Sequence, residues 1–215
     1  MKITILGATG NVGSRTLRQA IAAGHAVTAY ARHPDAVERL AGVSVVGGEL
    51  DDTAALTAAI SGADALIVTI TGPVRDKTFT QRTLPGIIKA AQDAGTGRLV
   101  LVSAFGAGDT ASKASAFARL IYRTALKGFL NDKAIAEKLL PASGLEWAIV
   151  YPVNLKDAPA LDSAAVKLLS DVRRVPGLPT LPLANAAKAL VEVAVNPEYA
   201  RQRVLVTTPT GWQPA

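Results

Sequence analysis

The chain has 215 residues, of which 49% are hydrophobic and 19% charged, and it carries a formal net charge of +6 and no cysteine. This length suits one domain, or one domain with a small appended lobe. The apolar fraction excludes an intrinsically disordered chain. The lack of cysteine excludes disulfides, thiolate zinc sites and a cysteine nucleophile. Only two histidines are present, His25 and His33, so we expect no bound metal.

One apolar segment, residues 56–74, is long enough to suggest a membrane span. It is interrupted by Ser61, Gly62 and Asp64 and closes on glycine and proline, so we interpret it as a helix end, a turn and a buried strand. The apolar run at residues 1–7 is too short for a signal peptide. We therefore expect a cytoplasmic protein with no membrane partner.

The positive charge raises the question of a nucleic-acid partner. Arg119, Arg123 and Lys127 are spaced by four and would share one face of a helix, a pattern that is usually a solvated surface. Aromatic residues make up only 5% of the chain, and no basic run is interleaved with them. Single-stranded nucleic acids need such rings for stacking. We therefore expect no nucleic-acid partner. The positive charge can instead bind an anionic small molecule.

The first half alternates short β-branched runs with helix-like segments. The predicted strands are residues 2–6, 26–30, 43–47, 65–70 and 98–103. The predicted helices are residues 12–23, 36–40, 52–60 and 81–94. Strands without polar alternation are buried on both faces, as in parallel sheets. Their alternation with helices indicates βαβ crossovers and an α/β fold with a doubly wound parallel sheet.

The second half continues this pattern less regularly. Residues 112–140 predict one long helix, with Gly128 as the place for a break, and residues 147–151 predict a sixth strand. Residues 152–182 are rich in proline and lack clear periodicity, which is typical of the loops that build substrate sites beyond a parallel sheet. A last helix is predicted at residues 184–195, before a strand at 203–207.

A glycine-rich turn follows the first predicted strand. Gly7 permits the tight turn, Gly10 lets the backbone approach a pyrophosphate, and Gly13 allows the helix to pack closely on the strand. The helix N-terminus then offers free N–H groups to phosphates. Since the flanking elements have the expected spacing, we predict a dinucleotide site rather than a plain strand–helix turn. The contacts predicted in this turn are Gly7, Thr9, Gly10, Asn11, Val12 and Gly13.

The end of the second strand indicates which dinucleotide is bound. An NAD site normally has an acidic residue there, to hold the ribose 2′-hydroxyl. This chain has Arg32 instead, and no acid before Asp35. Because a guanidinium pairs well with a 2′-phosphate, and Arg15 would help, we predict NADP(H) as the cofactor, with NAD(H) as the alternative.

The ends of other strands supply further candidates for the cofactor site. The Glu49 carboxylate stands where it would accept a hydrogen bond from the adenine amino group, although it would also serve as a simple helix cap. The remaining candidates are Leu50, Thr71, Gly72, Pro152 and Asn154.

The glycine motif, its spacing to Arg32, and the segment LLPASGLEWAIVYP at residues 139–152 together resemble a known group. They are similar to the atypical short-chain dehydrogenase/reductases with an NAD(P)H-binding domain, namely the NmrA-like proteins and the biliverdin-IXβ/flavin reductases. The resemblance covers nearly the whole chain. It implies a single Rossmann-type domain over residues 1–215, with a small C-terminal substrate lobe from residues 152–183 and 208–215, and a reduced nicotinamide cofactor.

The chain departs from the main short-chain dehydrogenase/reductase family at one catalytic position. In the main short-chain family, a Tyr-x-x-x-Lys pair supplies the proton donor and a lysine that holds the nicotinamide ribose. Here the matching residues are Phe129 and Lys133, so the lysine is kept and the acid is lost. Ser103 matches the family serine that orients the substrate oxygen. The alternatives are that Ser103 caps a turn and that Lys133 is a solvated helix lysine.

The missing tyrosine favours one class of substrate. General acid catalysis contributes about 10²–10⁴-fold where an alkoxide must be protonated. A flavin, quinone or linear tetrapyrrole spreads the hydride charge over a conjugated ring and needs the acid less. We therefore predict an NADPH-dependent oxidoreductase that reduces such a small-molecule acceptor, with protons ultimately from water. Ser103 would polarise the acceptor, while Lys133 and Asn154 would line the nicotinamide side.

Phe129 also leaves a second hypothesis open. Without an acid, the chain would instead be a non-catalytic NADP(H)-binding redox sensor of the NmrA-like type. The sequence leaves the choice between monomer and homodimer open.

Overall fold

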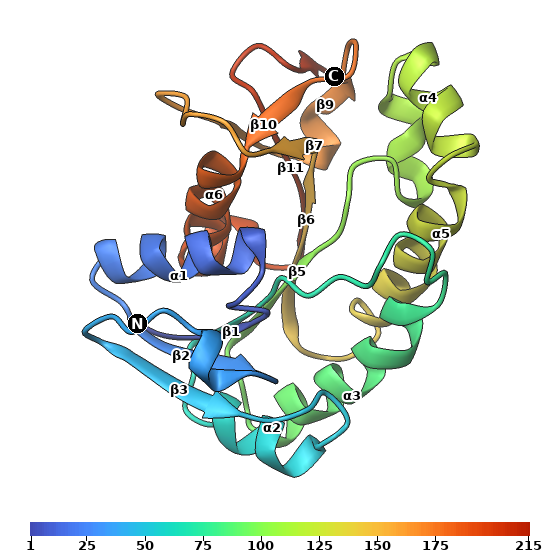
Figure 1. The fold of residues 1–215 in the computed structure, drawn as a ribbon. Coiled ribbons are helices and arrows are strands. Elements are labelled where there is room, and N and C mark those ends of the chain that lie inside the picture. The colour runs from blue at the N-terminus through green and yellow to red at the C-terminus, as the bar shows by residue number, and fades with distance from the viewer.

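A central sheet of eight strands organises the molecule, and the computed structural model describes all 215 residues (Figure 1). The strand order is β3-β2-β1-β4-β5-β6-β11-β8. Every neighbouring pair is parallel except β11 and β8. The predicted α/β, Rossmann-type doubly wound class is confirmed. The strands are β1 (Lys2–Leu6), β2 (Ala26–Ala31), β3 (Val43–Gly47), β4 (Ala65–Val68), β5 (Arg98–Val102), β6 (Glu146–Pro152), β8 (Ala165–Leu168) and β11 (Gln202–Thr207).

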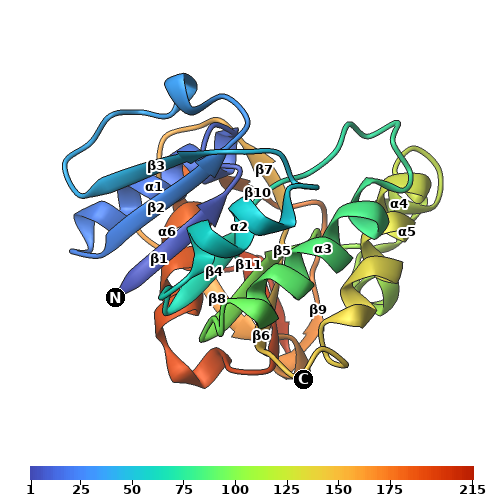
Figure 2. The ribbon, with the colours of Figure 1, turned by 90° about the horizontal axis from the view of Figure 1, so that it is seen from below.

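Helices cover both faces of this sheet. One face carries α1 (Asn11–Ala22) and α6 (Leu183–Val195), and the other carries α2 (Thr53–Ile60), α3 (Phe79–Asp93) and α5 (Lys127–Ala136), as Figures 1 and 2 show. Since both faces are covered, every residue of β4 and β5 is buried. This explains why their sequences are apolar without alternation. None of the helices combines the length and apolar character that a membrane span requires.

Two predicted helices are wrong. Residues 36–40 contain no α-helix, and only a 3₁₀ turn, η1 (Pro34–Ala36), precedes β3. The single helix over residues 112–140 is divided into η2 (Gly108–Lys113), α4 (Ala116–Arg123), α5 and η3 (Glu137–Leu139).

Thr124 accounts for the break between α4 and α5. Its hydroxyl donates to the carbonyl of Leu120 at 2.8 Å, and its φ and ψ of −109° and −83° leave the helical region. A threonine that bonds back to the preceding turn competes with helix continuation. Gly128, the expected place for the break, lies within α5. Arg119 and Arg123 therefore belong to a different helix from Lys127.

The proline-rich segment after β6 contains short strands that its sequence did not reveal. They are β7 (Asn154–Lys156), β8, β9 (Val172–Arg174) and β10 (Thr180–Pro182). β7 pairs with β10, and β9 pairs with β12 (Gln213–Pro214) at the end of the chain. β8 joins the predicted parallel sheet as an antiparallel edge strand that the sequence did not predict.

A buried carboxylate on α5 caps the start of α3. The N-cap residue of α3, Thr78, makes no capping hydrogen bond of its own. Asp132 accepts instead from the backbone N–H of Thr80 at 2.8 Å and of Gln81 at 3.1 Å. Burial raises the pKa of Asp132, but the hydrogen bonds from Thr80 and Gln81 outweigh it, and the pKa lies below its usual value. The pairing fixes α5 against α3.

We predict that Asp132→Ala lowers the free energy of unfolding by about 1–3 kcal/mol, because two buried N–H groups lose their acceptor. Since the pKa of Asp132 is lower in the folded state, this contribution is present above the unfolded pKa and is lost as the pH falls through the folded pKa. Urea unfolding at several pH values tests this. The control Asp93→Ala removes an exposed pair with Lys89 and should change stability by less than about 1 kcal/mol. Equal losses in both variants would argue against the cap.

Candidate functional site

The turn between β1 and α1 requires glycine at two positions. Gly7 has a φ of +87°, in the left-handed region. A Cβ at Gly13 would lie 2.0 Å from the carbonyl oxygen of Gly7, so the helix packs against the strand at a distance that only glycine allows. Thr69, at the end of β4, fixes this turn by donating from Oγ1 to the carbonyl of Leu6 at 2.7 Å. Thr69 is not among the predicted site residues, because a single threonine after a strand carries no distinctive pattern.

The N-terminus of α1 is open to an anion. Its N-cap residue, Gly10, offers no side-chain cap, and the first turn contains no acidic residue. Thr9 and Asn11 are exposed beside it. The free N–H groups and the positive end of the helix dipole suit a phosphate. The residues at this turn therefore fit the pyrophosphate of a dinucleotide.

A second group of predicted residues gathers where β2 and β3 end. The hydroxyl of Tyr30 donates to the backbone carbonyl of Glu49 at 2.7 Å, and the N–H of Gly48 donates to Ala31 at 3.2 Å. These bonds place Arg32, Glu49 and Leu50 at one edge of the sheet, with Arg32 exposed.

Arg15, the other arginine of the predicted phosphate site, forms hydrogen bonds to other groups of the protein. Its Nη2 donates to Asp157 at 2.8 Å, and its Nη1 donates to the carbonyl of Asn11 at 2.9 Å. The side chain therefore links the first turn of α1 to the segment that follows β7.

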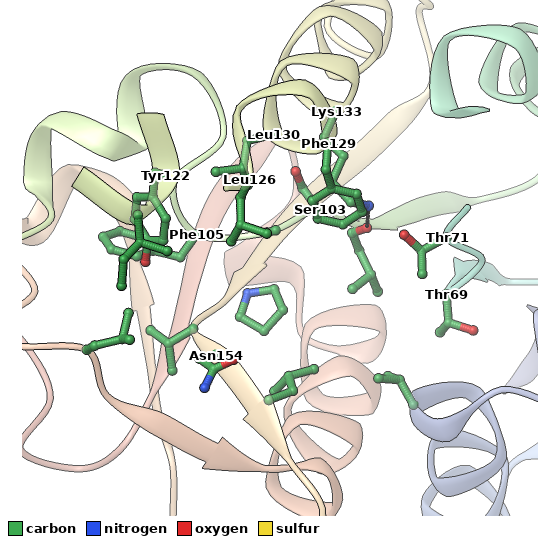
Figure 3. A pocket seen from close by; sticks show the side chains of 18 residues that line it. Thr69, Thr71, Ser103, Phe105, Tyr122, Leu126, Phe129, Leu130, Lys133 and Asn154 are labelled. Carbon is green, nitrogen blue, oxygen red and sulfur yellow. Dashed lines mark hydrogen bonds between the residues drawn. The ribbon is translucent and has the colours of Figure 1, made fainter. Parts of the chain in front are cut away.

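A cavity of about 340 Å³ lies beyond the carboxyl ends of β4, β5 and β6 (Figure 3). This volume is within the range of small-molecule sites. Six predicted site residues line it: Val12, Thr71, Ser103, Lys133, Pro152 and Asn154. The others are not among its lining residues: Gly7, Thr9, Gly10, Asn11, Gly13, Arg32, Glu49, Leu50 and Gly72.

The cavity has a polar end and an apolar aromatic end. Figure 3 shows Thr69 and Thr71 at one end and Phe105 with Tyr122 at the other. These two rings meet edge to face, with their centroids 6.4 Å apart. Twelve of the eighteen lining residues are hydrophobic, and none is acidic. Burial also raises the pKa of Tyr122, so its phenol stays neutral. The cavity suits a largely apolar molecule.

Lys133 is buried in the wall of this cavity, with 4% of its surface exposed. Its Nζ donates to the carbonyl of Val102 at 3.2 Å and lies 5.3 Å from the centroid of the Phe129 ring. Burial lowers the pKa of Lys133 to about 8, although the charges of Asp132 and Glu137 oppose this effect. The alternative of a solvated helix lysine is therefore wrong.

Ser103 contacts a carboxylate, Glu137, that is not among the predicted site residues. Its Oγ donates to Oε2 of Glu137 at 2.9 Å, and both residues are buried. The serine therefore does not serve as the turn cap considered above. Burial raises the pKa of Glu137, while hydrogen bonds to Ser103 and Tyr151 lower it, and the pKa lies above its usual value. The one-turn spacing between Lys133 and Glu137 was the available signal, because it places both side chains on one helix face.

Comparison with known proteins places these features in a wider context. The profile of a family described as NAD(P)H-binding matches residues 7–197. The Bacillus subtilis (strain 168) protein YhfK, described as an uncharacterized sugar epimerase, is 31% identical over 186 residues, which are 81% of this chain and 80% of that protein.

Two further relatives are reductases by description. The structure of ChuY, described as an anaerobillin reductase from Escherichia coli O157:H7, has a TM-score of 0.78 and 28% identity, and the match covers 100% of both chains. Phenylcoumaran benzylic ether reductase IRL1 of Ginkgo biloba is 28% identical over 160 residues. That match covers 69% of this chain and 47% of the Ginkgo protein.

We predict that Lys133→Met removes a rise in stability at alkaline pH. The pKa of about 8 in the folded state lies below the ordinary value of 10.5, so wild-type stability increases as the pH rises between these values. The increase should be about 3 kcal/mol. Urea unfolding from neutral to alkaline pH measures it, with the exposed Lys127→Met variant as a control that keeps the rise. Parallel pH dependences for wild type and Lys133→Met would contradict the buried titration.

Proposed function

The chain belongs to the NAD(P)H-binding family, and we propose that it is an NADPH-dependent reductase of a conjugated small-molecule acceptor: a flavin, a quinone or a linear tetrapyrrole. The observation that carries the proposal is the apolar cavity at the carboxyl edge of the sheet, into which Ser103 and Lys133 bring the polar groups (Figure 3). Open parallel sheets bind their ligands at this edge.

The proposed cofactor site extends from α1 to this cavity. The turn at residues 7–13 would hold the pyrophosphate, Arg32 the 2′-phosphate, and Glu49 the adenine amino group. Lys133 and Asn154 would line the nicotinamide side, together with Pro152. When bound, the nicotinamide supplies a hydride. The chain's own contribution is to bind, to orient the acceptor and to exclude water from the cavity.

The walls of the cavity favour a conjugated acceptor. Phe105, Tyr122 and Phe129 offer apolar ring surface, and no carboxylate faces the space. Phe129 occupies the position of the proton-donating tyrosine and has no proton to give. Ring systems that delocalise the added charge tolerate this loss best. The likeness to ChuY, described as an anaerobillin reductase, supports a tetrapyrrole within this class.

Arg32→Ala should weaken NADPH binding by about 10–100-fold, because charge-assisted hydrogen bonds contribute about 1.5–3 kcal/mol. NADH lacks the 2′-phosphate, so its affinity should hardly change. Titration calorimetry with both cofactors measures the difference. The control Arg39→Ala removes another exposed arginine of the β2–β3 connection and should leave both affinities unchanged. If Arg32→Ala weakens both cofactors equally, the residue does not recognise the phosphate.

The reductase proposal predicts NADPH oxidation in the presence of flavins, quinones or biliverdin, at rates above the background of the cofactor alone. Ser103→Ala should lower kcat by about 10²-fold, because the acceptor loses its polarising donor. The sensor alternative, which Phe129 favours, predicts no turnover with any acceptor and comparable thermal stabilisation by NADPH and NADP⁺. Turnover with at least one acceptor separates the two functions.

A further inference from the structure

Glu137 is a buried carboxyl placed directly behind Ser103. It is 7% exposed and does not line the cavity, whereas Ser103 does. Its Oε2 accepts from the serine hydroxyl at 2.9 Å. Ser103 therefore lies between this carboxyl and any molecule bound in the cavity.

A network of polar groups continues behind the carboxyl. The hydroxyl of Tyr151, a fully buried residue, interacts with Glu137 and accepts from Nε of Arg203 at 3.0 Å. Arg203 in turn donates from Nη1 to Asp109 at 2.9 Å, at the surface. The groups that face Glu137 are Ser103, directly after β5, Tyr151 from β6, Arg203 from β11, Asp109 from η2 and Lys133 from the preceding turn of α5.

These surroundings favour the protonated form of Glu137. Burial has the largest effect and raises the pKa of Glu137, and the negative charge of Asp109 raises it further. Hydrogen bonds to Ser103 and Tyr151 and the charge of Arg203 lower it by less. The opposite charge of Asp109, which is paired with Arg203, offsets part of the effect of Arg203 on Glu137. A raised pKa is what a group needs to deliver a proton near neutral pH.

We propose that Glu137 stores the proton that Ser103 passes to the acceptor, and positions the serine hydroxyl for that transfer. The inference rests on the proposed reductase function. An acceptor that fills the apolar cavity displaces water from Ser103, so the proton must come from behind the serine. Glu137 thereby replaces the acid that the chain lacks at Phe129.

The transfer balances in protons and electrons. The acceptor receives a hydride, with its two electrons, from NADPH at one atom and a proton from the Ser103 hydroxyl at another. When Glu137 is protonated, its O–H donates to Oγ of Ser103 along the same 2.9 Å contact, and the serine hydroxyl turns to donate into the cavity. The Ser103 O–H bond breaks as this second bond forms, and it is restored by the proton of Glu137, which becomes a carboxylate. The products are the reduced acceptor and NADP⁺. After product release, water re-enters the cavity and returns a proton to Glu137 through Ser103.

Glu137→Gln is the first test, because the amide keeps the size and the accepting oxygen of the carboxyl but stores no transferable proton. Wild-type kcat should fall as the pH rises through the pKa of Glu137, since only the protonated acid delivers. In Glu137→Gln, kcat should be about 10²-fold lower and this alkaline fall should be absent. The double variant with Ser103→Ala should be no slower than Ser103→Ala alone, because both residues act in one transfer.

Variants around Glu137 should move the alkaline fall in opposite directions. Asp109→Asn removes a charge that raises the pKa of Glu137, so the fall moves to lower pH. Tyr151→Phe removes a hydrogen bond that lowers this pKa, so the fall moves to higher pH. The control Glu192→Gln alters a different glutamate that accepts from a tyrosine, Tyr199 at 3.1 Å, and should leave the profile unchanged. A purely structural carboxyl would not produce two opposite shifts.

An infrared titration provides a readout that needs no turnover. Wild type should show a protonated-carboxyl band that titrates above the ordinary glutamate range and is absent from Glu137→Gln. If no acceptor is reduced, the reductase proposal fails, and the infrared band still decides the state of Glu137. A missing band overturns the proton store in either case. If acceptors are reduced and Glu137→Gln keeps the wild-type pH profile, the proton store is wrong while the reductase proposal stands.

Discussion

Two hydrogen bonds hold the carboxyl end of β5 against α5, and the site depends on them. Nζ of Lys133 donates to the carbonyl of Val102, and the hydroxyl of the next residue, Ser103, donates to Glu137. Burying a charged or polar group is costly unless it is hydrogen-bonded. Each of these groups therefore fixes its partner, and together they determine how far α5 stands from the sheet. Asp132, on the same helix, secures α3 in the same way.

The parts of the fold that the sequence predicted well are those with local causes. Gly7, Gly10 and Gly13 lie within one turn, and their roles follow from backbone sterics between neighbouring residues. The buried strands are recognisable because each has an uninterrupted apolar run. The break at Thr124 had a local cause too, but the single threonine was less conspicuous than Gly128, which lies inside α5 with the side chain of Lys77 close to its Cα.

What the sequence could not predict depends on contacts between distant segments. The antiparallel edge strand β8 exists because β11 pairs with it, and β9 exists because the last residues of the chain pair with it. The predicted residues Ser103, Lys133 and Asn154 line the cavity, whereas Glu137 was not predicted. A role for the Glu137 carboxyl is evident only from its contacts with Ser103, directly after β5, and Tyr151, in β6. Its one-turn spacing from Lys133 was visible but is common on solvated helices.

The charged groups of the site differ in their exposure to solvent, and this difference affects the chemistry of the site. Arg32 is exposed to an anionic ligand, while burial brings the pKa of Lys133 down to about 8 and raises that of Glu137. Neither histidine lines the cavity, and the chain has no cysteine. Among the titratable groups near Ser103, burial moves the pKa values of Lys133 and Glu137 toward neutral pH. Under the proposal for Glu137, a phenylalanine at position 129 does not end proton chemistry at this site, because the carboxyl behind the serine has a raised pKa.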